Sequence, residues 1–225
     1  MRNVFLLGSK GDIGQAILKK FKMEGCNVIA PSHAELDLEN IDAIDKFFEK
    51  NKDLNIGILV HCAGYNEPKL FEELTIKDIE KTNAINFIGF CKVVQHIIPY
   101  MKKKKEGYIV AISSLYGMYS RVKRAAYAMS KHALNGLIET LALELGPFNI
   151  KANIVSPGFV YTKMTIKNNP SEVIKSLEEK IPLGRLAKPE DIANVVFFLC
   201  SKENNYINGA NIVVDGGYSA GGFQK

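Results

Sequence analysis

A tyrosine and a lysine stand four residues apart, at Tyr127 and Lys131. The apolar periodicity predicts a helix from about Arg124 to Leu145, which would put both side chains on one face. Such a pair could do acid–base chemistry, because a nearby ammonium favours the phenolate and lowers a tyrosine pKa from about 10 toward neutrality. The same spacing is also compatible with a simple surface contact. Other residues near the pair are needed to distinguish a catalytic role from such a contact.

Two further polar residues could join this pair. Ser114 follows an expected strand, Tyr108–Ser113, at the carboxyl end where ligands bind in open α/β sheets. This strand and the Tyr127 helix are consecutive elements, so the hydroxyl can lie near the phenol. Asn86 is unfavoured inside an expected helix from about Ile76 to Met101 and needs a hydrogen-bonding reason. A serine at a strand end can also be a plain turn residue.

A glycine-rich turn near the N-terminus, Gly8-Ser9-Lys10-Gly11-Asp12-Ile13-Gly14, joins an expected strand to an amphipathic helix. In this context the turn is predicted to bind phosphate, because glycines permit close backbone approach and helix amides attract the charge. The alternative is a tight turn without a ligand. The spacing G-x-x-G-x-x-G differs from G-x-G-x-x-G and does not identify the nucleotide.

Short apolar runs and longer amphipathic stretches alternate and would position these residues. The expected strands are Asn3–Leu7, Asn27–Ala30, Ile56–His61, Tyr108–Ser113, Ile150–Val155 and Asn211–Val214. Strands that alternate with helices imply right-handed crossovers and a parallel sheet covered on both faces. We predict an α/β fold, a doubly wound Rossmann-type parallel sheet, with residues 1–225 forming a single domain.

One connection is short. Only about four residues separate the second strand from a short extended segment, Glu35–Leu38, too few for a crossover helix of about a dozen residues. We therefore expect a helix to be missing between strands two and three. The next helix is predicted over Asn40–Asn51, which begins with a capping Asn.

The composition indicates a globular chain: 225 residues, 47% hydrophobic, 24% charged, with a formal net charge of +5. The mild charge excludes little, and the basic run Lys102–Lys105 suits a helix C-terminus better than nucleic acid. No targeting or membrane segment is visible. Four scattered cysteines without a C-x-x-C pair predict buried reduced thiols, no metal site and a cytoplasmic location.

Seven short motifs in one order resemble the short-chain dehydrogenase/reductase family over the whole chain. They are Gly8-x-x-Gly11-x-x-Gly14, His61-Cys62-Ala63-Gly64 in place of Asn-Asn-Ala-Gly, Asn86-Phe87-Ile88-Gly89, Ile112-Ser113-Ser114, Tyr127-Ala128-Met129-Ser130-Lys131, Asn153-Ile154-Val155-Ser156-Pro157-Gly158 and Val214-Asp215-Gly216-Gly217. The departures from the family, which are Leu7 where threonine is usual, the glycine spacing and the missing helix, all lie on the cofactor side.

The resemblance implies an NAD(P)(H)-dependent enzyme that interconverts a carbonyl and a secondary alcohol by hydride transfer. Tyr127 would protonate the carbonyl oxygen and Ser114 would polarise it. Lys131 would hold the nicotinamide ribose and lower the tyrosine pKa, while Asn86 would hold a water of the proton relay. The resemblance and the glycine turn together give these expected cofactor contacts: Gly8, Ser9, Lys10, Gly11, Asp12, Ile13, Gly14, Ser32, His33, Asp37, Leu38, Cys62, Ala63, Gly64, Tyr127, Lys131, Pro157, Gly158, Val160 and Thr162.

The end of the second strand bears on the choice of cofactor. A carboxylate there would bind the adenosine ribose diol and repel a 2′-phosphate, and none is present in the sequence at that place. Lys10 with Ser32 and His33 could meet a phosphate instead, and the resemblance puts Asp37 with Leu38 beside the adenine. We therefore predict NADP(H) in preference to NAD(H).

Substrate contacts are expected from Leu115–Ala126 and from a loop region at about 159–180. The first segment carries Tyr116, Tyr119, Arg121, Lys123 and Arg124. These suit either a solvated loop or a polar or anionic substrate, such as an acyl carrier or a nucleotide-linked sugar.

Three motifs near the C-terminus resemble the branch that contains 3-oxoacyl-[acyl-carrier-protein] reductases, as well as sugar, polyol and steroid dehydrogenases: Ile181-Pro182-Leu183-Gly184-Arg185, Pro189-Glu190-Asp191 and Asp215-Gly216-Gly217. The substrate is thus expected to be a small or carrier-linked carbonyl compound: a 3-oxoacyl thioester or other ketone, alternatively a keto-sugar or nucleotide-sugar. By resemblance, a homodimer or homotetramer forms through the helices of Asn86 and Tyr127. An inactive NADP-binding regulator is the alternative of another class, although it would not need the complete set of four polar residues.

Overall fold

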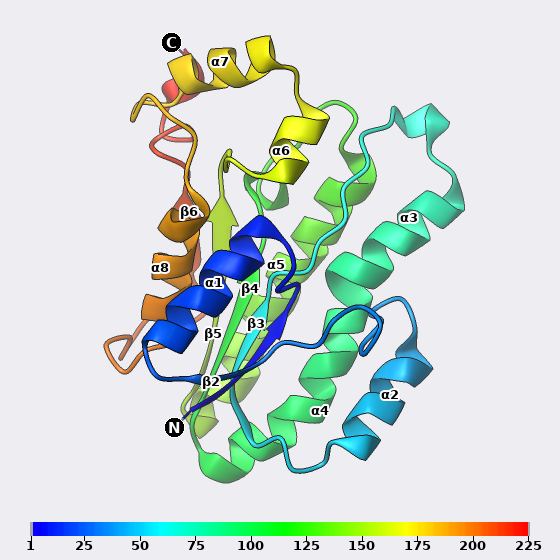
Figure 1. Cartoon of the computed structure of the whole chain (residues 1–225), viewed down its shortest axis with the longest axis vertical. Helices are drawn as coiled ribbons and strands as arrows, with labels where there is room; N and C mark the ends of the chain where they lie inside the picture. The colour runs from blue at the N-terminus through cyan, green and yellow to red at the C-terminus, as the bar shows by residue number, and fades with distance from the viewer. Residues whose placement is uncertain (1, 225) are drawn as a thin grey trace.

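Six parallel strands form one sheet in the computed structural model, which describes residues 2–224 (Figure 1). The strands are β1 (Asn3–Leu7), β2 (Asn27–Ile29), β3 (Ile56–His61), β4 (Gly107–Ile112), β5 (Ile150–Pro157) and β6 (Asn211–Val214). Their order is β2-β1-β3-β4-β5-β6. All six predicted strands are present, with ends shifted by at most two residues, because central strands covered on both faces are nearly continuous apolar runs.

Helices cover both faces of this sheet, so the doubly wound prediction is confirmed (Figure 1). The helices are α1 (Asp12–Met23), α2 (Ile41–Lys50), α3 (Ile76–Asn83), α4 (Gly89–Lys104), α5 (Ala125–Leu145), α6 (Lys163–Asn168), α7 (Ser171–Lys180) and α8 (Pro189–Leu199). Helices α1 and α8 pack together on one face, and α2, α4 and α5 cover the other. Short α6 and α7 lie beyond the carboxyl ends of the strands.

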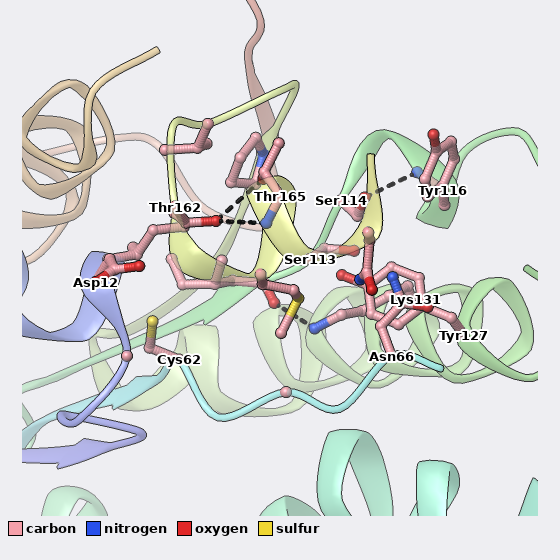
Figure 2. Close-up of a pocket in the computed structure, with 18 of the residues that line it drawn as sticks. Asp12, Cys62, Asn66, Ser113, Ser114, Tyr116, Tyr127, Lys131, Thr162 and Thr165 are labelled. Carbon is pink, nitrogen blue, oxygen red and sulfur yellow. Dashed lines mark hydrogen bonds between the residues drawn. The ribbon is translucent and has the colours of Figure 1, made fainter. Parts of the chain in front are cut away.

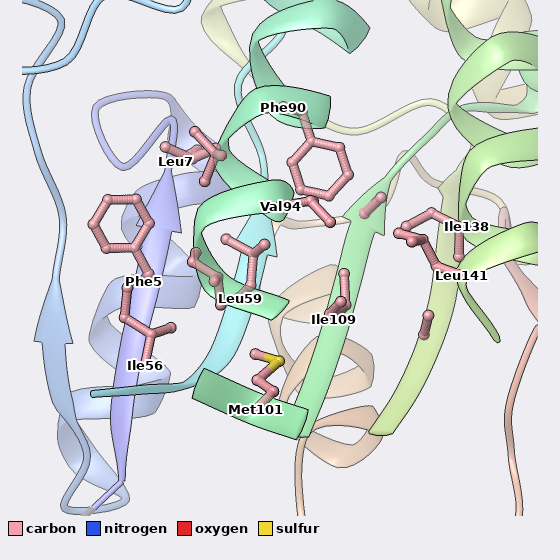
Figure 3. Packing of buried hydrophobic residues seen from close by; sticks show 14 of the residues in the cluster. Phe5, Leu7, Ile56, Leu59, Phe90, Val94, Met101, Ile109, Ile138 and Leu141 are labelled. Atoms are coloured by element: carbon pink, nitrogen blue, oxygen red, sulfur yellow. The ribbon is translucent and has the colours of Figure 1, made fainter. Parts of the chain in front are cut away.

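The core on the α4 side anchors the elements that carry the polar residues. Figure 3 shows Phe90 and Val94 of α4 over Leu59 of β3 and Ile109 of β4, with Ile138 of α5 alongside. All five side chains are at most 2% exposed. Because such interiors are close-packed, α4 and α5 are held firmly relative to the strand ends.

The expectation of an extended segment at Glu35–Leu38 was wrong. The chain turns there, with the Glu35 amide donating to the Ser32 carbonyl at 3.0 Å, and β2 is an edge strand. The apolar alternation that suggested a strand has another cause, since Leu36 and Leu38 are buried in the core as loop anchors.

The helix predicted over Asn40–Asn51 is α2, whose first turn is capped by Asn40: its Oδ1 accepts from the Ala43 amide at 3.0 Å. This helix makes the crossover from β2 to β3, passing β1, which lies between these strands in the sheet. Residues 30–40 contain no helix, so the helix expected to be missing between the second strand and Glu35–Leu38 is indeed absent there, and α2 is the next helix, as predicted.

A π-helical turn, Ala84–Ile88, interrupts the long helix predicted from Ile76 to Met101. It separates α3 from α4 and contains Asn86, whose side chain is fully buried. Such turns widen a helix by one residue and free backbone groups from the regular pattern.

Among the cysteines, Cys200 is buried and Cys26, Cys62 and Cys91 are partly buried, and all four are free thiols. No helix within residues 2–224 combines the length and apolar character needed to cross a bilayer.

Candidate active site

One cavity of about 500 Å³ opens where the central strands end. Its walls include Gly8 after β1, Cys62 after β3, Ser113 after β4 and Gly158 after β5. Parallel strands point the same way, so their carboxyl ends meet at one edge, where ligands of open α/β sheets bind. The predicted residues that line it are Gly8, Lys10, Gly11, Asp12, Ile13, Gly14, Cys62, Ala63, Gly64, Ser114, Tyr127, Lys131, Pro157, Gly158, Val160 and Thr162.

The glycine turn forms one end of this cavity, and the tyrosine helix forms the other. In Figure 2, Asp12 and Cys62 lie at one end while Tyr116 and Tyr127 lie at the opposite end. Gly8 has a φ of +83°, and a Cβ at this position would overlap the backbone of Ala63. A side chain is excluded at Gly8 for both reasons, which explains why the turn needs glycine.

Tyr127 and Lys131 project into the cavity from α5, with Lys131 Nζ 5.6 Å from the phenol ring centre (Figure 2). Lys131 is buried and donates a 2.8 Å hydrogen bond to the Ile112 carbonyl at the end of β4. Burial lowers the pKa of Lys131 to about 8. The ammonium is thus fixed beside the phenol by a strand end, which agrees with the sequence expectation of a shared helix face.

The pKa of Tyr127 is raised to about 12, chiefly because burial disfavours the phenolate. A hydrogen bond with the Ser114 side chain and the charge of Arg124 act in the opposite direction. The sequence predicted a pKa lowered by Lys131, whereas burial raises the pKa of this phenol. In this structure the group is a neutral phenol at pH 7, in the protonated form that an acid requires.

Asn86 does not line the cavity and instead ties three segments together. Its Oδ1 accepts from the Tyr65 amide at 2.7 Å, and its Nδ2 donates to the Tyr65 carbonyl at 3.0 Å and to Ser130 Oγ at 2.9 Å. Ser130 Oγ in turn donates to the Tyr127 carbonyl at 2.8 Å. Asn86 therefore connects the loop after β3 to the backbone that carries Tyr127.

His61 completes this arrangement at the end of β3. Its Nε2 lies 3.0 Å from the backbone oxygen of Asn86, and since a carbonyl only accepts, Nε2 carries the proton. The ring stacks on Phe90 with centres 4.4 Å apart. Burial and the charge of Lys131 lower the pKa of His61 to about 3, so the imidazole is neutral. His61 thus makes a hydrogen bond at the position where the family has an asparagine.

The comparison with protein families matches residues 30–219 to the model described as enoyl-(acyl carrier protein) reductase. A curated relative, 3-oxoacyl-[acyl-carrier-protein] reductase FabG of Aquifex aeolicus (strain VF5), is 36% identical over 220 residues, which cover 95% of this chain and 86% of the relative. The chain belongs to the short-chain dehydrogenase/reductase family. It is therefore an oxidoreductase, and the predicted carbonyl–alcohol chemistry is confirmed at the level of the family.

Solved structures of similar dehydrogenases agree with this assignment. A structure of 4-hydroxyisoleucine dehydrogenase complexed with NADH superposes with a TM-score of 0.90, at 29% identity, covering 98% of this chain and all of that one (100%). A structure of ElxO with NADP bound superposes with a TM-score of 0.88, at 26% identity, covering 97% of this chain and 99% of that one. The similarity extends over almost the whole chain in both cases.

Five other predicted cofactor contacts or neighbours lie outside this short-chain dehydrogenase cavity. They are Ser9, Ser32, His33, Asp37 and Leu38. Ser9 is buried within the glycine turn, and Leu38 is buried in the core. Ser32, His33 and Asp37 lie in the loop after β2, where carboxylates contact the Ser32 and His33 side chains.

Those carboxylates come from the loop itself. The amide and the hydroxyl of Ser32 both lie 2.7 Å from Glu35 Oε2, and His33 Nδ1 lies 3.5 Å from Asp37 Oδ1. The two Ser32 hydrogen bonds hold the pKa of Glu35 below its usual range, and the charge of Lys10 adds a smaller effect in the same direction. The contact of Glu35 with Ser32 could not be predicted from the sequence, because it forms only when the chain turns after Ser32.

The loop region predicted at 159–180 forms α6 and α7, and its first part lines the cavity. Thr162 caps α6 by accepting from the Thr165 amide at 3.1 Å. The Lys163 amide donates to Asp12 Oδ2 at 2.6 Å, which links this region to the start of α1. The lining residues after Thr162 are Lys163, Met164, Thr165, Asn168 and Asn169. A sequence cannot show which of them face inward, because that depends on how α6 settles over the strand ends.

The segment Leu115–Ala126 divides into two groups. Tyr116, Arg121 and Arg124 line the cavity, whereas Tyr119 and Lys123 do not and are exposed. A solvated loop does not describe Arg124, whose side chain is only 8% exposed.

Proposed function

We propose that this chain reduces a carbonyl to a secondary alcohol, and runs the reverse reaction, with Tyr127 exchanging the proton at the substrate oxygen. The observation that carries the proposal is one cavity lined at one end by the glycine turn and at the other by Ser114, Tyr127 and Lys131. A nicotinamide cofactor supplies the hydride when bound. The protein's own contribution is position and proton transfer.

Each residue has a role that its environment supports. Tyr127 is a neutral phenol with a hydrogen bond to Ser114, so the two hydroxyls can meet the same substrate oxygen. Lys131 presents a fixed cation beside Tyr127 for the ribose hydroxyls. Asn86 is a positioning residue in this proposal, because its side-chain atoms are already bonded to Tyr65 and Ser130.

The glycine turn fits a nicotinamide dinucleotide. Gly8 and Gly14 let the turn pack closely against the start of α1, since a Cβ at Gly14 would overlap the Gly8 carbonyl. The first turn of α1 lines the cavity with its amides, where a pyrophosphate is stabilised. The related structures with NADH and with NADP support a nicotinamide cofactor here as well.

The preference for NADP(H) over NAD(H) is a further part of the proposal, and it depends on Lys10. This lysine lines the cavity at the glycine turn, where its charge favours a 2′-phosphate. Ser32 can bind that phosphate only if Glu35 releases it, since Glu35 takes both Ser32 donors. In this proposal Lys10 thus favours binding of NADP(H), and Glu35 opposes it.

The 3-oxoacyl thioesters are the first substrate class to test, because the Aquifex relative is named for them. Keto-sugars and nucleotide-linked keto-sugars are the second class. A panel of β-ketoacyl thioesters, keto-sugars and simple ketones, followed by cofactor absorbance with NADH and NADPH, compares them directly.

Three remaining proposals concern the chain as a whole. Two core clusters on opposite faces of one sheet support a single domain. Exposed apolar side chains on the long helices, among them Met129 and Leu143 of α5, support a homodimer or homotetramer. The four free thiols support a cytoplasmic location.

Tyr127→Phe tests the mechanism. We expect kcat to fall by at least about 100-fold while NAD(P)H binding, followed by cofactor fluorescence, stays within a few-fold. The matched control is Tyr119→Phe, which removes an exposed phenol outside the cavity and should leave turnover unchanged. Near-normal turnover of Tyr127→Phe would exclude the assigned role, and cofactor binding without turnover of any panel member by the wild type would favour an inactive regulator.

A further inference from the structure

The cavity is strongly cationic. Its charged lining residues are Lys10, Asp12, Arg121, Arg124, Lys131 and Lys163. The proposed function accounts for several of them, since Lys10 and Asp12 belong to the glycine turn and Lys131 to the catalytic group. Lys163 adjoins the same turn through its amide bond to Asp12. Arg121 and Arg124 are not accounted for, and of these two only Arg124 is buried.

Arg124 is a buried arginine without a counter-charge. A guanidinium has five N–H donors, and Nη1 donates to Asn66 Oδ1 at 3.0 Å. Within residues 2–224 no carboxylate forms an ion pair with it, although its side chain is 8% exposed. Arginines are rarely so buried unless a negative charge pairs with them, because removing the charge from water is costly.

The position of Arg124 connects it to the chemistry. It is the residue just before α5, three residues ahead of Tyr127, and both line the cavity. Arg124 is the N-cap residue and Tyr127 lies in the first turn of α5, so the two side chains leave the backbone within one helical turn of each other, a distance of about 5 Å along the axis. The charge of Arg124 also lowers the pKa of Tyr127, so the two groups lie within electrostatic reach.

Two structural roles do not explain this charge. The first role is to hold the loop after β3 through the hydrogen bond to Asn66. A neutral donor could make that bond, and the neutral amide of Asn66 does not offset the charge of the guanidinium. A standing phenolate at Tyr127 would offset it, but burial keeps that phenol protonated at pH 7. Both interpretations leave a buried cation that lines the cavity without a counter-charge among residues 2–224.

We infer that the substrate carries a carboxylate a few bonds from the carbonyl that is reduced, and that Arg124 binds this carboxylate. The inference rests on the proposed function and narrows its substrate class. A guanidinium fork matches a carboxylate with two parallel hydrogen bonds. A neutral thioester at the same place would exclude water and leave Arg124 buried without a counter-charge.

The test compares short keto acids with their methyl esters, for example 3-oxobutanoate, 4-oxopentanoate and 5-oxohexanoate. Within each pair the ester replaces the negative charge by one methyl group, so the ratio of kcat/KM for acid and ester reports chiefly on the charge, and the change in that ratio in a variant reports on the substituted residue. We expect the wild type to favour the acid of at least one pair. Arg124→Met should raise KM for that acid by about 100-fold, the effect of losing charge-assisted hydrogen bonds, and change KM for the ester by less than about 3-fold.

Two variants complete the design. Lys123→Met removes the neighbouring positive charge outside the cavity and should leave the acid-to-ester ratio unchanged. Arg124→Ala should regain acid turnover when guanidinium chloride is added at millimolar concentration, which a loss of folding would not allow. Turnover of the ester reports that each variant is folded.

The outcomes separate the inference from the proposed function. A wild type that uses ester and acid equally, or an Arg124→Met variant whose ratio is unchanged, would overturn the inference and leave the reductase intact. No turnover of any keto acid, ester or other carbonyl in the panel, with either cofactor, would overturn the proposed function and the inference with it.

Discussion

His61 should make the stability of this protein sensitive to acid. Its pKa is about 3 in the folded chain and about 6.5 in an unfolded one, because burial disfavours the imidazolium. Between these two pH values the unfolded chain binds one more proton than the folded chain. The contribution of His61 to the free energy of unfolding is therefore fully present above pH 6.5 and is lost as the pH falls below that value. The loss is about 1.4 kcal/mol per pH unit, or about 2 kcal/mol between pH 7 and pH 5.

The substitution that tests this is His61→Phe. Phenylalanine can keep the stack on Phe90 but leaves the Asn86 carbonyl without its donor, which costs about 1–2 kcal/mol at pH 7. The variant has no imidazole to titrate, so it escapes the acid loss. The wild type should therefore be more stable at pH 7, and the difference should vanish or reverse at pH 5.

Urea unfolding at pH 7 and at pH 5 measures the stability difference between wild type and His61→Phe at each pH. The contributions of all other titrating groups cancel in this difference, because both proteins contain them. His132→Gln is the control, because it removes an exposed histidine from the same protein. A stability difference between wild type and His61→Phe that is the same at pH 5 as at pH 7 would refute the neutral, buried imidazole. A fully stable variant at pH 7 would refute the importance of the Asn86 contact.

Two further substitutions test the cofactor end. Gly14→Ala would bring a Cβ into the Gly8 carbonyl, so we expect NAD(P)H affinity measured by fluorescence to fall by at least about 10-fold; Gly136→Ala, at an exposed helix position with open space around it, should bind normally. Glu35→Gln weakens the hold on Ser32 and removes a negative charge, so kcat/KM for NADPH relative to NADH should rise by about 5-fold or more. An unchanged ratio would show that Glu35 does not discriminate between the cofactors.

The sequence predicted the strands, and that Ser114, Tyr127 and Lys131 lie together, because these features depend on local patterns. The runs at Ile56–His61 and Asn211–Val214 are strands over those same residues, and Ser114, Tyr127 and Lys131 share one cavity. Consecutive elements of a doubly wound sheet leave little freedom in how strand ends and helix starts meet.

The errors occurred where tertiary contacts override local pattern. Leu36 and Leu38 alternate as in a strand, yet they are buried as loop anchors with nothing to pair on that side of β2. The partners of Asn86 could not be predicted either, because a π-turn directs its side chain to Tyr65 and Ser130. The burial of Arg124 was equally invisible, because a charged loop residue looks the same in a sequence whether water or protein surrounds it.

The short edge strand has a consequence for how the molecule behaves in a crowded solution. An exposed edge offers unpaired amides and carbonyls to any other extended chain, and long flat edges promote aggregation. Strand β2 is only three residues long, and Pro31, which follows it closely, has no amide hydrogen to offer. This edge therefore offers very few backbone groups to a strand of another molecule. The short strand and the proline protect the edge from intermolecular pairing without an additional strand or helix over it.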